Sequence, residues 1–270
     1  MTATTTVQTP APARATPSNA RLSFGRLVRS ETIKLLTLRS TWWSLGVTAV
    51  LAIGISLLMA WASQDFGGDF NPVGAIVAPM QFTMLVAGIL GAMAITGEYS
   101  TGMIRSTLTA EPRRGAVLVA KAVVVALLLA ATTVVTTIVS VVASAPIFGD
   151  RAIDWTDAES SVLPLVLGVL AMATFALLGL GWGFIIRNGA GAIAATVGIL
   201  FVMPIVLSLF AFGGDSWAWI VDLGQYLPAS AAQTVTSPGS DDFVTGLITL
   251  LAWPTATLLG GWAILRATDA

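Results

Sequence analysis

The sequence has no cysteine, no histidine and very little charge. Without cysteine the 270 residues can form no disulfide and offer no thiol nucleophile or thiolate metal ligand. Without histidine they lack the side chain that most often serves as a general base or a metal ligand. Only 10% of the residues are charged, against about a quarter in soluble domains, and the net charge of −1 argues against nucleic-acid binding. With 56% hydrophobic residues and a mean hydropathy of +0.86, the composition indicates an integral membrane protein.

Long apolar runs account for this composition. A helix needs about 20 apolar residues to cross a bilayer core of about 30 Å. Six uncharged stretches meet this length: 42–62, 76–96, 122–144, 162–186, 190–212 and 244–265. They are continuous, whereas the strands of a membrane β-barrel alternate polar and apolar residues. The predicted fold class is therefore an all-α integral membrane protein with six transmembrane helices.

Basic residues lie almost entirely on one side of the predicted spans. Twelve of the thirteen are on that side: Arg14, Arg21, Arg26, Arg29, Lys34, Arg39, Arg105, Arg113, Arg114, Lys121, Arg187 and Arg266. The other side has Arg151 and ten acidic residues: Asp65, Asp69, Asp150, Asp154, Asp157, Glu159, Asp215, Asp222, Asp241 and Asp242. The positive-inside rule then predicts a multi-pass protein of the cell membrane with both termini in the cytoplasm.

Two domains are expected. Residues 1–20 are rich in Thr, Ala and Pro, which is typical of a disordered tail, here on the cytoplasmic side. Residues 21–270 are expected to form a single transmembrane domain. Within it the segment 213–242 is too polar for a seventh span, and a short interfacial or re-entrant helix is expected there.

The spans offer little chemistry of their own. Ionisable residues inside a membrane usually mark proton relays or catalytic centres, and the predicted spans have none. The hydroxyls of one span either line a polar path or bond to backbone carbonyls four residues back: Thr132, Thr133, Thr136, Thr137 and Ser140. The small residues at Gly179, Gly181, Gly183 and 190–198 permit close helix contacts, either within the bundle or across a dimer.

The sequence also lacks the motif of an ATP-binding P-loop. A phosphate-binding P-loop needs Gly-x-x-x-x-Gly-Lys-Ser/Thr, and neither Lys34 nor Lys121 lies in that frame. We therefore expect no enzyme activity and no catalytic, metal or cofactor site on this chain. If ATP drives its function, a separate chain must hydrolyse it.

The segment 97–121, GEYSTGMIRSTLTAEPRRGAVLVAK, is the most informative part of the sequence. Met103, Ile104 and Leu108 fall on one face of a short helix. Glu111-Pro112 then breaks that helix, and a new one is expected to begin at Pro112. Taken alone, the segment also fits an ordinary basic intracellular loop near lipid phosphates.

The segment 21–39, RLSFGRLVRSETIKLLTLR, predicts a second amphipathic helix that leads into the first span. An apolar stripe runs along it: Phe24, Leu27, Val28, Leu35 and Leu38. Glu31 interrupts the stripe, and Lys34, three residues on, is its expected partner. A helix lying on the cytoplasmic leaflet is predicted.

This order of parts resembles the permease subunits of ATP-binding-cassette transporters of the type 2 exporter class, in particular actinobacterial ones. The family has a pattern close to Glu-x-x-x-Gly-Thr, then leucines, Pro and Arg, between spans 2 and 3. The matching residues here are Glu98, Gly102, Leu108, Pro112 and Arg114, with Met103 in place of the usual Thr. The stretches SETIKLLTLRSTWW and Tyr226-Leu227-Pro228-Ala229 are also similar to family segments.

The resemblance implies a mechanism. Two permease halves, identical or homologous, would bind two nucleotide-binding ATPase subunits that carry the ATP and Mg. Residues 100–108 would be the coupling helix, with exposed Met103 and Ile104 and charged Arg105 against the ATPase. The residues assigned to this coupling are Glu98, Gly102, Met103, Ile104, Arg105, Leu108, Pro112 and Arg114. The N-terminal helix would brace the same interface through Glu31, Lys34, Leu35 and Arg39.

Two alternatives stay open. A stand-alone secondary transporter would use an ion gradient, including sodium bound by carbonyls and hydroxyls. A non-transporting membrane scaffold or regulatory subunit would have nearly the same sequence. The direction of transport is implied by the resemblance alone.

Overall fold

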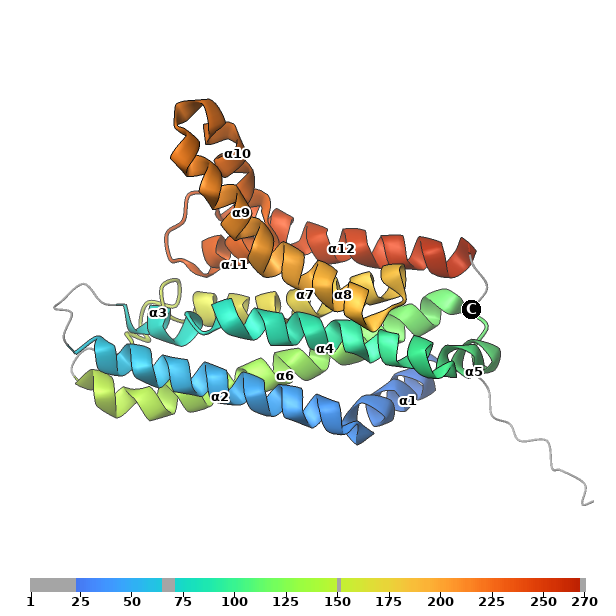
Figure 1. The fold of residues 1–270 in the computed structure, drawn as a ribbon. Helices are drawn as coiled ribbons and strands as arrows, with labels where there is room; N and C mark the ends of the chain where they lie inside the picture. The colour runs from blue at the N-terminus through green and yellow to red at the C-terminus, as the bar shows by residue number, and fades with distance from the viewer. Residues whose placement is uncertain (1–22, 65–70, 150–151, 268–270) are drawn as a thin grey trace, which may run out of the picture.

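The computed structural model describes residues 23–64, 71–149 and 152–267, and the predicted tail 1–20 lies outside them. Every regular element in these ranges is helical (Figure 1). The longer helices are α1 (Phe24–Thr37), α2 (Arg39–Ala62), α4 (Met80–Thr101), α5 (Met103–Ala110), α6 (Arg114–Phe148), α7 (Val162–Ile186), α8 (Gly189–Val197), α11 (Pro228–Thr236) and α12 (Phe243–Ala267). The shorter ones are α3 (Pro72–Val77), η2 (Gly198–Val202), α9 (Met203–Leu209), η3 (Phe210–Gly213), η4 (Asp215–Trp217), α10 (Ala218–Asp222) and η5 (Leu223–Tyr226).

The six predicted spans are confirmed. The helices long and apolar enough to cross a bilayer are Arg39–Ala62, Pro72–Thr101, Arg114–Phe148, Val162–Ile186, Gly189–Gly213 and Phe243–Ala267. The protein is thus an all-helical, multi-pass membrane protein. Each predicted stretch lies inside one of these helical runs.

Two helices extend beyond their predicted apolar stretches at one end of the bundle. The second span continues past 96 to Thr101 and so includes Glu98. The third begins at Arg114 rather than at 122 and so includes Lys121. The spanning helices therefore carry charges near their ends, where polar side chains find partners within the protein.

Helix α7 lies at the centre of the fold (Figure 1). It packs against α4, α6, α8 and α12, and more than half of its apolar stretch is buried. Phe175 and Phe184 are among its fully buried side chains. By contrast, only about a fifth of the apolar stretches of α2 and α12 is buried, as expected for helices that face lipid.

Glycines allow α4 and α7 to pack backbone against backbone. A Cβ atom on Gly91 would lie 1.9 Å from the carbonyl oxygen of Ala176, and one on Gly179 would lie 1.9 Å from that of Gly88. Gly181 similarly faces Thr257 of α12, and a Cβ there would lie 2.4 Å from the hydroxyl oxygen of Thr257. The small-residue face of α7 thus serves packing within the bundle, which was one of the two alternatives.

We predict that Gly91→Ala strongly destabilises the fold, because the new methyl group must separate α4 from α7. Overpacking of this kind costs about 1–3 kcal/mol, and more where backbone is the obstacle. Thermal unfolding in detergent measures it. The matched control is Gly54→Ala in α2, where a Cβ meets nothing within 4 Å. An equal unfolding temperature for the two variants would contradict the close packing.

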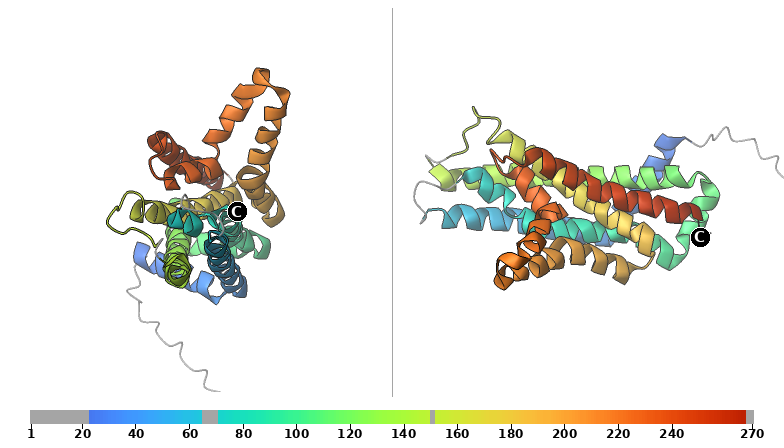
Figure 2. Two further views of the ribbon diagram at one scale, coloured as in Figure 1. Left: turned by 90° about the vertical axis from the view of Figure 1, so that its left-hand side faces the viewer. Right: turned by 90° about the horizontal axis from the view of Figure 1, so that it is seen from above.

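The fifth span is irregular and leads away from the bundle. A π-helical turn, η2, interrupts it just before Pro204, whose ring removes one backbone donor. Beyond this point α9 and α10 form a hairpin that projects from the other helices (Figure 2). Helix α11 returns to the bundle and packs on α12 and α7 through Ala231, Ala232 and Val235. The expected short helix in 213–242 is therefore present.

Hydroxyls in α6 behave mainly as local hydrogen-bond donors. Thr132 donates to the carbonyl of Leu128 and Thr133 to that of Leu129, each over 2.8 Å. This confirms the carbonyl-bonding alternative for these two residues. Thr133, Thr136 and Ser140 also line a small cleft of about 40 Å³.

Candidate functional site: a buried charge cluster and its cleft

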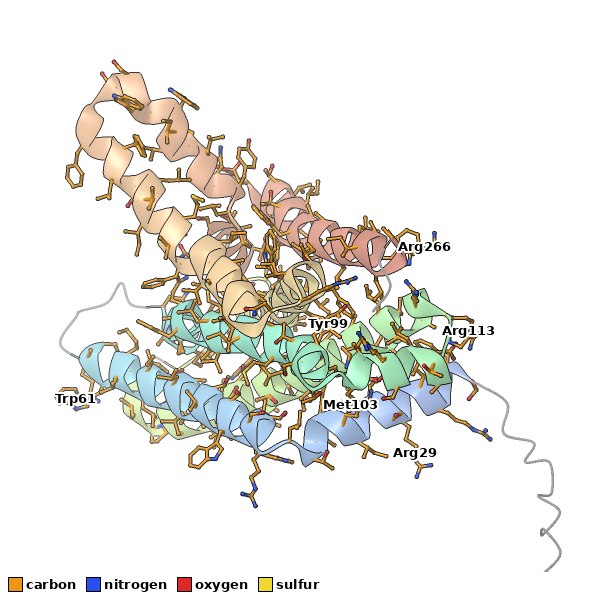
Figure 3. The ribbon with its side chains drawn as sticks, turned by 45° about the vertical axis from the view of Figure 1, so that its right-hand side comes forward. Arg29, Trp61, Tyr99, Met103, Arg113 and Arg266 are labelled. Atoms are coloured by element: carbon orange, nitrogen blue, oxygen red, sulfur yellow. The ribbon has the colours of Figure 1, made fainter. Side chains whose placement is uncertain are left out.

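Charged residues divide between the two ends of the bundle. In Figure 3, Arg29, Arg113 and Arg266 lie towards one end and Trp61 towards the other. We call the first the basic end. Helices α1 and α5 lie there, on the same side as the ends of α4 and α12 and the beginning of α6 (Figure 1).

Helix α1 begins and ends at clear signals. Ser23 is its N-cap, and the Ser23 side chain accepts a hydrogen bond from the backbone N–H of Arg26. At the other end Leu38 is extended, which separates α1 from α2. Glu31 and Leu35, one turn apart, are its two buried residues. The residue that interrupts the apolar stripe therefore faces the protein interior.

Four charged side chains, including Glu31, meet in the interior at the basic end. The Lys121 ammonium of α6 bonds to the Glu31 carboxylate and lies 2.8 Å from Oε1 of Glu98 in α4. The Lys34 ammonium lies 2.7 Å from Oε1 of Glu31 and 3.0 Å from Oε1 of Glu98. The Thr107 hydroxyl of α5 lies 3.2 Å from Lys34 Nζ and 3.4 Å from Glu98 Oε2. We call Glu31, Lys34, Glu98 and Lys121 the charge cluster.

The charge cluster has equal numbers of acidic and basic groups, and three of its four members are almost completely buried. It contains two carboxylates and two ammonium groups, and the exposed fractions of Glu31, Glu98 and Lys121 are 0%, 3% and 1%. Burying a single charge is very costly, and such groups persist only when they are paired and hydrogen-bonded. Each member therefore depends on the others, and together they join α1, α4 and α6, with α5 attached through Thr107.

Lys34 is the member nearest to solvent. Burial by itself would lower its pKa, but the hydrogen bond and charge of Glu31, together with the charge of Glu98, outweigh burial and raise the pKa above the ordinary value for lysine. Lys34 is therefore protonated throughout the physiological range.

A cleft of about 440 Å³ opens beside the charge cluster, between α1 and α5. Glu31 and Lys34 form part of its wall, and Met103 and Ser106 of α5 stand opposite Arg26 and Leu27 of α1. The Met103 side chain is 40% exposed, and Arg105 is exposed as well. The basic end thus presents an apolar and cationic surface around a groove.

Glycine sets the start of α5. Gly102 has φ 71°, in the left-handed region that favours glycine, and the chain turns there between α4 and α5. The helix predicted over 100–108 is therefore displaced to Met103–Ala110. The expectation that Ile104 is exposed is wrong: Ile104 is 3% exposed, and it belongs to the main core together with Leu35.

A turn at Glu111 sets the start of α6. The Glu111 carboxylate accepts bonds from the backbone N–H of Arg113 over 3.2 Å and from its side-chain Nε over 2.8 Å. The hydrogen bond from Arg113 lowers the pKa of the Glu111 carboxyl. This turn keeps Pro112 and Arg113 outside the helix. The prediction that the next helix begins at Pro112 is therefore wrong, because it begins at Arg114.

Two arginines hold the end of α12. Arg114 donates to the carbonyl of Leu265 over 2.6 Å, and Arg187 donates to that of Ile264 over 3.2 Å. Cations at the last carbonyls of a helix also complement its dipole. The end of α12 is thereby fixed to the start of α6 and to the turn between α7 and α8.

The structure brings some of the predicted site residues together and leaves others apart. Glu31, Lys34 and Glu98 come together, and the predicted Glu31–Lys34 pair is present. Met103, Arg105 and Arg39 are exposed instead. Sequence reasoning missed the role of Lys121 and Thr107. The available signal was a pair of opposite charges. Glu98 lies at the end of the second span and Lys121 near the start of the third, so a hairpin of these two spans can bring them together.

Comparison with protein families gives one result that covers most of the chain. Residues 27–210 match the family model described as ABC-2 family transporter protein. A comparison with curated proteins gives no match. The matched residues include most of α1, the whole charge cluster, α5, the first four spans and most of the fifth. The protein is therefore a transmembrane permease that belongs to the ABC-2 transporter family.

Proposed function

We propose that this permease is half of an ATP-driven exporter whose ATPase is a separate polypeptide. The basic end faces the cytoplasm, and the ATPase binds over the cleft between α1 and α5. ATP and Mg are bound by that partner, and a second permease half, identical or homologous, completes the transmembrane pathway. The sequence offers no P-loop, which fits a division of labour between the chains.

One observation carries this proposal: α5 is exposed on one side and tied to the spanning helices on the other. Its exposed side presents Met103 and Arg105, which suit a protein partner because methionine and arginine are common in interface cores. Its inner side inserts Ile104 into the core and brings Thr107 to the charge cluster. A force applied to α5 by the ATPase would therefore reach α4 and α6 directly.

Co-purification tests the proposal. The permease is co-expressed with a candidate ATP-binding-cassette ATPase from the same organism, and ATP hydrolysis is measured in lipid vesicles. We expect a stable complex whose ATPase activity depends on the permease. Transport driven by an ion gradient without any ATPase would favour a secondary transporter instead. A permease that binds the ATPase without changing its activity would favour a scaffold.

The orientation gives a separate prediction. Because the natural chain has no cysteine, single cysteines report their side of the membrane. A cysteine at the exposed Ser216 should react with a membrane-impermeant maleimide added to intact cells, and one at the exposed Thr109 should react only after lysis. The reverse pattern would contradict the proposed orientation.

A further inference from the structure

A second cleft lies where α1 bends into α2, on the side that faces α4. Its volume is about 140 Å³, which is ample for a group larger than one water molecule. Ser40, Thr41 and Ser44 from the first turns of α2 contribute hydroxyls to its lining. Leu90 and Met93 of α4 form the apolar wall opposite. The cleft is therefore mostly apolar, with three hydroxyl-bearing residues at its α2 side.

The hydroxyl of Thr41 has no hydrogen-bond partner among the described residues, although the residue is only 4% exposed. Neighbouring threonines behave differently: Thr37 donates to the carbonyl of Ile33 and Thr48 to that of Ser44, each over 2.9 Å. Four residues before Thr41 the chain is still in α1, because Leu38 is extended between the helices. The bend thus denies Thr41 its usual acceptor and leaves its hydroxyl for a ligand in the cleft.

The start of α2 favours an anion at this place. The helix has 24 residues, and Leu38 at its N-cap provides no side-chain hydrogen bond to the free N–H groups of the first turn. These N–H groups and the helix dipole attract negative charge, and phosphate is one of the anions that helix starts bind. Arg39, the first residue of α2, adds a full positive charge beside them.

The surroundings identify the source of the anion. Trp42 and Trp43 are 58% and 76% exposed, and tryptophan on a membrane protein concentrates at the level of the lipid headgroups. Leu38, Leu90 and Met93 provide apolar surface that suits an acyl chain. We propose that this cleft binds the phosphate of a phospholipid in the leaflet at the basic end, through Ser40, Thr41, Ser44 and the first N–H groups of α2.

This lipid would fix the angle between α1 and α2, and so the position of Glu31 and Lys34. The lipid proposal requires that this permease lies in a membrane. It does not require the proposed ATPase partner. Its test is therefore a binding measurement on the permease alone.

The experiment measures lipid binding to the delipidated protein in detergent by native mass spectrometry. The probes are phosphatidylglycerol, diacylglycerol and inorganic phosphate. The first variant is Ser40→Ala, Thr41→Val, Ser44→Ala, which removes the hydroxyls but keeps the shape. The second is Gly97→Leu, which fills the cleft from a position where a Cβ meets nothing within 4 Å. The control is Thr255→Val, whose exposed hydroxyl bonds only to its own helix at Leu251.

Wild type and Thr255→Val should bind phosphatidylglycerol equally, and both cleft variants should bind it about tenfold or more weakly, since hydrogen bonds to a charged group are lost. Diacylglycerol and inorganic phosphate should bind far more weakly than phosphatidylglycerol. Unchanged binding by the cleft variants would overturn the site. Equal binding of diacylglycerol would overturn the phosphate contact, and equal binding of inorganic phosphate would overturn the lipid assignment.

Discussion

Replacing Lys121 by methionine should destabilise the permease by about 3–5 kcal/mol, which is the usual cost of breaking a buried ion pair by removing one partner. Methionine keeps most of the volume but removes the ammonium that bonds to Glu31 and Glu98. Two carboxylates would then share the single remaining ammonium of Lys34, in a place that water scarcely reaches. Equilibrium unfolding in mixed detergent micelles measures the loss.

Charge balance provides the controls for this prediction. The double variant Lys121→Met, Glu31→Gln restores neutrality, and it should be more stable than Lys121→Met alone even though it carries more changes. Arg29→Met removes an exposed positive charge from α1 and should change stability by less than about 0.5 kcal/mol. If Lys121→Met cost no more than Arg29→Met, the charge cluster would not hold the helices together.

The second large effect should come from the exposed side of α5. Met103→Glu combined with Arg105→Glu places two negative charges where an apolar side chain and a positive one now face outwards. The stability of the isolated permease should change little, because neither side chain is buried. The ATPase activity that depends on the permease should fall at least tenfold, because reversed charges at an interface cost several kcal/mol.

A matched variant separates this docking effect from a general effect of surface charge. Asp241→Lys combined with Asp242→Lys changes two exposed charges at the opposite end of the bundle and should leave the ATPase activity unchanged. Ile104→Asp is unsuitable for this purpose, because Ile104 is buried and its loss would unfold the site. Full permease-dependent ATPase activity of the Met103→Glu, Arg105→Glu variant would contradict docking at α5.

The spans could be predicted because a bilayer demands about 20 apolar residues, which the sequence displays openly. The ends of the spanning helices could not be predicted in this way, because a helix continues through charged residues wherever these find partners inside the protein. Glu98 and Lys121 lie in such extensions of α4 and α6. Only the packing of these two helices beside α1 reveals that their charges meet.

Distance along the chain also explains which parts of the site were predictable. Glu31 and Lys34 are three residues apart, so helical geometry alone pairs them. Lys121 reaches Glu31 across 90 residues, and no local pattern specifies that contact. In the same way the apolar stripe of α5 was visible, but the neighbour that covers Ile104 was not, and so its burial was missed.

Cross-linking tests the central claim most directly, namely that a separate ATPase binds the permease at α5. A cysteine at Met103 carries a short photoactivatable cross-linker, and the permease is co-expressed with its ATPase partner and illuminated in membranes. We predict a covalent adduct between the two chains from position 103 and none from a cysteine at the exposed Trp155, at the opposite end. An adduct from Trp155 and none from Met103, in a complex with active ATPase, would contradict the account.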